Sequence, residues 1–89
     1  MKKEQLQVVF RKFSNGEVIA LFPQLTDKYR YRITTYMHIG QHSEDDHHAV
    51  VQQTKLATEE EYAPLLTEIE QIYHEYDLRV MKKLNVKWN

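Results

Sequence analysis

The chain of 89 residues contains no cysteine and only two glycines and two prolines. The lack of cysteine excludes disulfides, thiolate zinc sites and thiol nucleophiles. With so little glycine, the chain has no glycine-rich loop to hold a phosphate group. No apolar run approaches the roughly 20 residues that a membrane helix needs, and the first residues do not resemble a signal peptide. We therefore expect a cytoplasmic protein without membrane contact.

The composition that remains is that of one small globular domain. Hydrophobic residues make up 42% of the chain and charged residues 28%. A chain of this size buries roughly 60–65% of its unfolded surface, which is enough for one core. We expect a single domain over residues 1–89.

The net charge of −1 conceals a strong segregation along the sequence. Residues 1–42 carry seven Lys and Arg against three Asp and Glu, and residues 43–77 carry one against ten. Residues 78–89 carry four basic residues and no acidic one. If the two basic ends lie side by side in a sheet, the folded protein has a basic side and an acidic side.

Two stretches rich in β-branched and aromatic residues, 6–13 and 17–22, flank Ser14-Asn15-Gly16 and predict a hairpin. Asn15 and Gly16 both tolerate positive φ, so a two-residue turn and a three-residue loop with a bulge remain open. With the longer loop, one face holds Val8, Phe10, Lys12, Val18, Ala20 and Phe22, and the other Val9, Arg11, Phe13, Glu17, Ile19 and Leu21. Apolar residues on both faces predict a central hairpin or a second cover. Pro23 is expected to end the second strand.

Residues 31–39 alternate and predict a half-buried strand. One side carries Tyr31, Ile33, Thr35, Met37 and Ile39, and the other Arg30, Arg32, Thr34, Tyr36 and His38. For the polar segment that follows, Ser43 with three acidic residues favours a capped helix through about Gln52. Val50, Val51 and Thr54 favour an extended segment instead, so residues 47–56 remain open between helix and strand.

Thr58-Glu59-Glu60-Glu61 forms a capping box that predicts the start of a long amphipathic helix. Its apolar stripe comprises Tyr62, Leu65, Leu66, Ile69, Ile72, Tyr73 and Tyr76, and its outer face Glu68, Gln71 and Glu75. Pro64 predicts a bend or a later start. Leu78 and Val80 alternate with polar neighbours in a last short strand. These elements predict an α+β two-layer sandwich, with an antiparallel sheet of three to four strands and one long helix on one face.

Three strings in this order resemble a family of short uncharacterised bacterial proteins that often occur on phages and conjugative elements. They are FRKFSNGEVIALFP (Phe10 to Pro23), YMHIGQH (Tyr36 to His42) and ATEEEYAPL (Ala57 to Leu65). The family often has Pro directly after the Thr of the helix start, where this chain has Glu59. The resemblance implies a shared fold and an accessory role on mobile DNA, and it carries over no catalytic residue.

The residues that offer metal-ligand chemistry are concentrated in one polar segment. It contains four histidines, interspersed with three acidic residues: His38, His42, His47 and His48, with Glu44, Asp45 and Asp46. Their spacing matches no established metal signature. A His-rich metal site is therefore an alternative, and we assign no metal ligand and no cofactor. No serine lies in a nucleophile elbow, so we expect no catalytic residue and no enzyme.

The sheet face opposite the helix is the predicted binding surface. We expect it to carry Arg30, Arg32, Tyr36, His38, Arg79 and Lys83. Tyr and Arg are frequent at binding hot spots, so a protein partner or a second copy of the chain is the leading hypothesis. The same mixture of cations and an aromatic ring suits single-stranded nucleic acid, although the sequence pI of about 6.5 opposes it. The sequence thus predicts an interaction domain, with nucleic-acid binding as the alternative.

Overall fold

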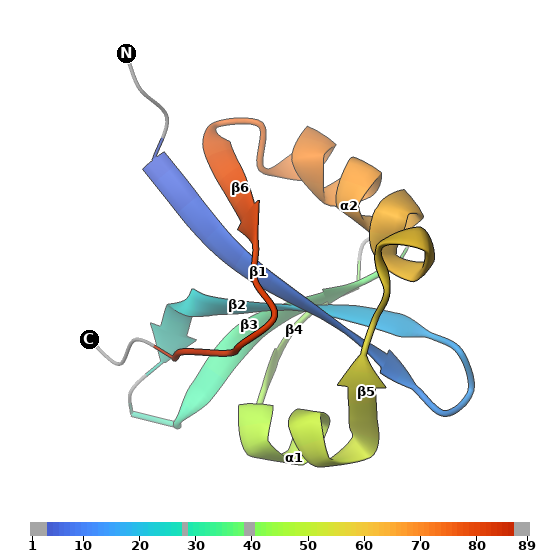
Figure 1. Cartoon of the computed structure of the whole chain (residues 1–89). Helices are drawn as coiled ribbons and strands as arrows, with labels where there is room; N and C mark the ends of the chain where they lie inside the picture. Colours follow the sequence, from blue (N-terminus) through green and yellow to red (C-terminus); the bar gives the residue numbers. More distant parts are fainter. Residues whose placement is uncertain (1–3, 28, 39–40, 87–89) are drawn as a thin grey trace.

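The computed structural model describes residues 4–27, 29–38 and 41–86, which fold into an α+β domain (Figure 1). A curled sheet forms its centre, and a helix lies on each side of that sheet. In chain order the elements are β1 Glu4–Phe13, β2 Val18–Asp27, β3 Arg32–Met37, β4 Gln41–Asp45, α1 His47–Gln53, β5 Thr54–Leu56, α2 Glu59–Ile72 and β6 Tyr76–Val80. The α+β class is confirmed. The long helix is α2, and the short helix α1 accompanies it. The expected three to four strands are too few, because the short segments β4 and β5 also form strands of the sheet.

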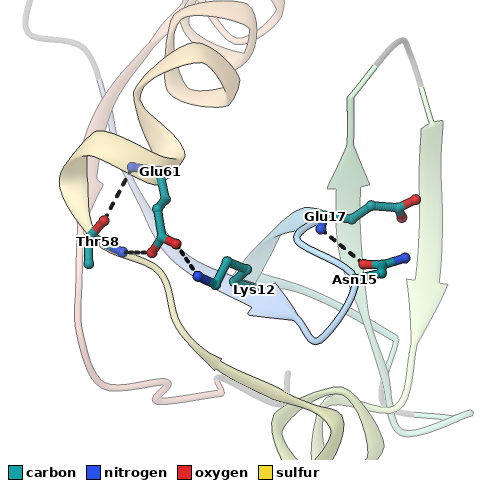
Figure 2. Close-up of polar contacts among 5 residues, drawn as sticks. All are labelled: Lys12, Asn15, Glu17, Thr58 and Glu61. Carbon is teal, nitrogen blue, oxygen red and sulfur yellow. Dashed lines mark hydrogen bonds and ion pairs between the residues drawn. The ribbon is translucent and has the colours of Figure 1, made fainter.

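The β1–β2 hairpin has the longer of the two loops that the sequence allowed. The Phe13 amide donates to the Glu17 carbonyl at 2.8 Å, and the Gly16 amide donates to the Phe13 carbonyl at 2.9 Å. Gly16 has φ +94°, a conformation that glycine adopts without steric cost. The Asn15 side chain accepts the Glu17 amide at 3.0 Å, as Figure 2 shows. Loop chemistry therefore fixes the register, in which Phe10 pairs with Ala20.

This register divides the apolar side chains of the hairpin between two cores, as the longer loop predicts. Val8, Phe10, Ala20 and Phe22 belong to the larger core, whose remaining members are Leu6, Tyr36, Ala57, Leu65 and Ile69. Ile19 and Leu21 belong to a smaller core with Ile33 and Val50. Helix α2 covers the first and α1 the second, on opposite sides of the sheet (Figure 1). The hairpin is apolar on both faces because both faces are covered.

Pro23 does not end β2, contrary to the sequence-based expectation. The strand continues to Asp27 across an irregularity between Phe22 and Thr26. Proline has no amide hydrogen to donate to a ladder, and a bulge accommodates that lack. The Gln24 side chain then accepts the Gln7 amide at 2.6 Å, so a side chain completes the pairing that the backbone leaves open.

The outer edge of β1 is shared by two short strands. The backbone groups of β1 alternate between its two edges: the Phe13 amide donates to Glu17 on the β2 side, whereas the Val8 and Phe10 carbonyls accept amides from the opposite edge. There β6 runs parallel to residues 4–8, and β5 runs antiparallel to residues 11–13. The Arg11 guanidinium holds β5 by donating to the Thr54 hydroxyl at 2.7 Å and its carbonyl at 2.8 Å. β1 is thus paired along both edges.

Residues 47–56, for which the sequence favoured neither helix nor strand, contain both. Helix α1 starts after Asp46, whose side chain accepts the His48 amide at 3.0 Å. Ser43 is therefore not its cap but lies in the edge strand β4, which pairs with β3. Thr54 then ends α1 and begins β5. The β-branched residues near Thr54 marked a strand that is too short to predict from periodicity.

Helix α2 begins with the predicted capping box (Figure 2). The Thr58 hydroxyl accepts the Glu61 amide at 3.3 Å, and the Glu61 carboxylate accepts the Thr58 amide at 2.9 Å. The ammonium group of Lys12 on β1 also donates to that carboxylate. The start is thus fixed at Glu59, with Pro64 inside the helix, so the expected later start is wrong. One carboxylate both caps the helix and joins it to the sheet.

The predicted stripe docks on the sheet, with two exceptions near its end. Leu65 and Ile69 are buried in the larger core, with Tyr62, Leu66 and Tyr73 packed around them. Ile72 is 42% exposed, and the helix ends there. Tyr76 lies in β6 rather than in the helix, but its side chain still packs on the same core. The stripe therefore extends beyond the helix that it predicted.

Truncation of Ile69 tests the docking of α2. Ile69 is fully buried, so Ile69→Ala removes three heavy atoms from a filled core and should destabilise the protein by about 2–5 kcal/mol. Ile72→Ala, on the same helix at an exposed position, should change stability by less than about 0.5 kcal/mol. Urea unfolding followed by circular dichroism measures both. Equal effects would contradict the assigned packing.

The Lys12–Glu61 contact predicts an acid-sensitive helix start. The Lys12 hydrogen bond, followed by that of the Thr58 amide, lowers the pKa of Glu61 to about 2. A carboxyl whose folded pKa is depressed stabilises the fold above its unfolded pKa, and that stability disappears as pH falls through the folded value. Glu61→Gln keeps the capping geometry without the charge. Between pH 5 and pH 2, the melting temperature of this variant should therefore fall less than that of the wild type.

Candidate functional site

The face that was expected to be open is covered at Tyr36. This residue pairs with Ala20, so its side chain lies on the α2 side of the sheet and is only 1% exposed. Its hydroxyl donates to the Glu68 carboxylate of α2. The expectation that Tyr36 faces solvent or a partner is wrong, because α2 packs over the alternate residues of β3 that include Tyr36. Ile33, on the other face, packs in the smaller core instead.

His38 belongs to the same polar contact between β3 and α2. Its Nδ1 lies 2.6 Å from the second carboxylate oxygen of Glu68, and its ring is mostly exposed. Glu68 was expected on the outer face of the helix, but it is half-buried between Tyr36 and His38. Nearby, His42 Nε2 lies 3.0 Å from the Tyr73 hydroxyl, and burial raises the pKa of that hydroxyl. These residues join the helix to the sheet.

Arg79 and Lys83 lie at the opposite edge of the sheet from this contact. Arg79 is in β6, where its guanidinium is 2.9 Å from the Asp77 carboxylate. Lys83 is exposed just after β6. Two pairs of the six predicted binding residues are brought together. Tyr36 and His38 share Glu68, and Arg30 and Arg32 lie on one exposed surface.

That surface is the turn between β2 and β3, which we call the tyrosine–arginine turn (Tyr29–Arg32). Its two tyrosines are the most exposed large apolar residues among those described: Tyr29 is 86% exposed and Tyr31 70%. The Asp27 side chain accepts the amides of Tyr29 at 3.1 Å and Arg30 at 3.4 Å, which folds the turn. Tyr31 has φ 55°, a left-handed conformation that is unusual for a large side chain.

The turn borders an open hollow of about 530 Å³ at the start of α1. Arg30, Tyr31 and Arg32 line one side, and Asp46, His47 and His48 the other. Burial is the main cause that lowers the pKa of His47; His48 adds to it and Asp46 opposes it. Arg30 also lies 3.5 Å from Asp27 and 3.9 Å from Glu44. The surface therefore combines aromatic rings with charges of both signs.

The histidines do not converge on one point. His38 contacts Glu68, His42 contacts Tyr73, and the rings of His47 and His48 lie side by side with centroids 4.1 Å apart. Within residues 4–27, 29–38 and 41–86, no three His, Asp or Glu side chains are placed to hold a metal ion. Ile39, the last residue of the predicted half-buried strand, lies outside the described residues.

Comparison with known proteins identifies no relative: no family model, curated protein or solved structure matches the sequence. The resemblance to short proteins of mobile elements therefore remains a prediction. In the part of the chain that the structure describes, neither helix has the length and apolar character needed to cross a bilayer.

The two tyrosines of the turn are not among the six binding residues predicted from the sequence. The alternation over residues 31–39 placed Tyr31 in a strand, whereas the strand begins at Arg32. A signal was present in the sequence, because Tyr29-Arg30-Tyr31-Arg32 alternates aromatic and cationic residues. Strand periodicity concealed it, since the same alternation is also typical of a half-buried strand.

The left-handed conformation of Tyr31 predicts an unusual substitution pattern. Glycine adopts this conformation without the steric conflict that a Cβ introduces, so Tyr31→Gly should stabilise the protein by about 0.5–1 kcal/mol. Tyr31→Val should destabilise it, because a β-branched side chain tolerates positive φ least. Urea unfolding measures both variants. A loss of stability with glycine equal to that with valine would contradict the described turn.

Proposed function

We propose that this protein is a protein-interaction module that contacts its partner through the tyrosine–arginine turn. The observation that carries the proposal is the exposure of Tyr29 and Tyr31, at 86% and 70%, beside Arg30 and Arg32. Tyrosine and arginine are enriched among the residues that dominate binding energy at protein interfaces. Each provides a large contact area together with a polar group that selects orientation.

The charges around the turn favour a protein over nucleic acid. Arg30 lies near Asp27 and Glu44, and Asp46 lines the same hollow. A strand of nucleic acid presents phosphates at regular spacing, and these carboxylates would repel them. A protein surface offers charges of both signs at fixed positions, which can match both the arginines and the carboxylates around the turn.

The turn is also held in shape before any partner binds. Thr26 pairs with Ile33 and Asp27 with Arg32, so the two strands are joined up to the base of the turn. The Asp27 side chain accepts the amides of Tyr29 and Arg30. A rigid loop loses less conformational entropy on binding than a flexible one, and more of the contact energy remains as affinity.

Site-specific cross-linking tests the proposal. A photoreactive phenylalanine analogue at position 29, introduced in cells that carry the natural gene, should yield a discrete cross-linked partner that mass spectrometry identifies. The same analogue at the exposed position of Glu75 serves as the matched control and should not yield that species. With the purified partner, Tyr29→Ala and Tyr31→Ala should each weaken binding by about 2 kcal/mol, or about thirtyfold.

A second arm distinguishes nucleic acid from protein. A fluorescent single-stranded oligonucleotide, titrated with the protein at low salt, should show no change in anisotropy. Tight binding that weakens with added salt and disappears in Arg30→Glu/Arg32→Glu would replace the proposal with nucleic-acid recognition. Equal cross-linking at positions 29 and 75 would contradict a specific surface.

A further inference from the structure

Two strands end head to head on one edge of β1 and leave a groove between them. β6 runs along β1 from Glu4 towards Val8, and β5 runs in the opposite direction from Phe13 to Arg11. Just beyond their ends, the Met81 amide donates to the Val8 carbonyl and the Ala57 amide to the Phe10 carbonyl. The segment after β5 continues into α2, and the segment after β6 turns away towards the smaller core (Figure 1).

The groove at this junction is mainly apolar. Phe10 and Tyr62, whose rings stack at 4.5 Å, line it together with exposed side chains of both strand ends. Leu56 is 41% exposed, Val80 39% and Met81 36%. Scattered exposed apolar residues are ordinary, but several that share one hollow indicate a surface that another chain covers.

The rims of the groove carry opposite charges. Lys82 lines one side and Glu59 the other, and Lys83 and Glu60 follow in the sequence. The ion pairs among the described residues include none between these two rims. The basic rim belongs to the segment after β6, and the acidic rim to the first turn of α2.

We propose that this groove, formed by Phe10, Leu56, Tyr62, Val80 and Met81, binds the same groove of a second copy of this chain. A two-fold axis places identical patches face to face, so each patch must complement itself. Here apolar centre meets apolar centre, and the Lys82 rim of one copy meets the Glu59 rim of the other. An unrelated partner has no reason to match both rims, whereas a second copy does so by symmetry.

The first experiment measures mass in solution. Light scattering and sedimentation equilibrium of the full chain, from about 5 to about 200 µM, should show conversion to twice the 10.8 kDa of one chain. Leu56→Arg and Met81→Glu should each weaken the dimer by about tenfold or more, because each introduces a charge at the apolar centre.

Ile72→Arg is the matched control, because Ile72 is as exposed as Leu56 but lies at the far end of α2, about 20 Å from Glu59. It should leave the dimer unchanged. Thermal unfolding of each variant separates loss of assembly from loss of folding. Arg30→Glu should also leave the mass unchanged, so failure of the dimer and failure of the proposed turn interaction are distinguishable.

Charge exchange identifies the occupant of the groove. Lys82→Glu and Glu59→Lys should each weaken the dimer, and the double variant should recover it, because the two rims then meet again with exchanged signs. A single-chain mass for the wild type over the whole range overturns the proposal. A dimer that survives Leu56→Arg and Met81→Glu, or a double variant that does not recover, also overturns it.

Discussion

The fold depends on the pairing of β1 along both of its edges. On one edge, residues 9–12 pair with β2, and on the other β6 and β5 divide the strand between them. β2, β5 and β6 pair with this strand directly, β3 is joined to it through β2, and β4 is joined to it through β3 and β2. Because β1 contributes Phe10 to the larger core and its Arg11 side chain to β5, a shift of register by one residue would exchange both contacts. The three-residue loop at Gly16 fixes that register, and it thereby decides which side chains α2 covers.

The parts of the fold that sequence predicts well have strong local signals. The hairpin follows from its turn residues, and the start of α2 follows from Thr58 and Glu61, which satisfy each other's backbone amides. The division of the hairpin residues between two faces followed once the loop length was chosen. These features depend on residues within a few positions of one another, so a single sequence contains the necessary information.

The orientation of β3 was not predictable in this way. Tyr36 shares one side of the predicted strand with Thr34 and His38, and these polar neighbours favoured exposure of its side chain to solvent. Its burial depends on the pairing with Ala20, a small residue that leaves room beneath α2, and on Glu68, which accepts its hydroxyl. A buried tyrosine needs such an acceptor, and only the tertiary structure supplies one 32 positions away in the sequence. Periodicity separates the two faces of a strand, but it does not identify which face a helix covers.

The segregated charges have a structural role that their distribution along the sequence did not indicate. Lys12 contacts Glu61, Arg30 approaches Glu44, and His38 contacts Glu68. Each contact joins the basic first part of the chain to the acidic middle part. Exposed ion pairs of this kind contribute little stability individually. However, each part of the chain carries mainly charges of one sign, so repulsion disfavours incorrect contacts between segments of the same part. The tyrosines of the turn and the apolar residues at the ends of β5 and β6 are exposed side chains without charge. Both surfaces are exposed in the single chain, and this exposure is the reason that an intermolecular role is proposed for each of them.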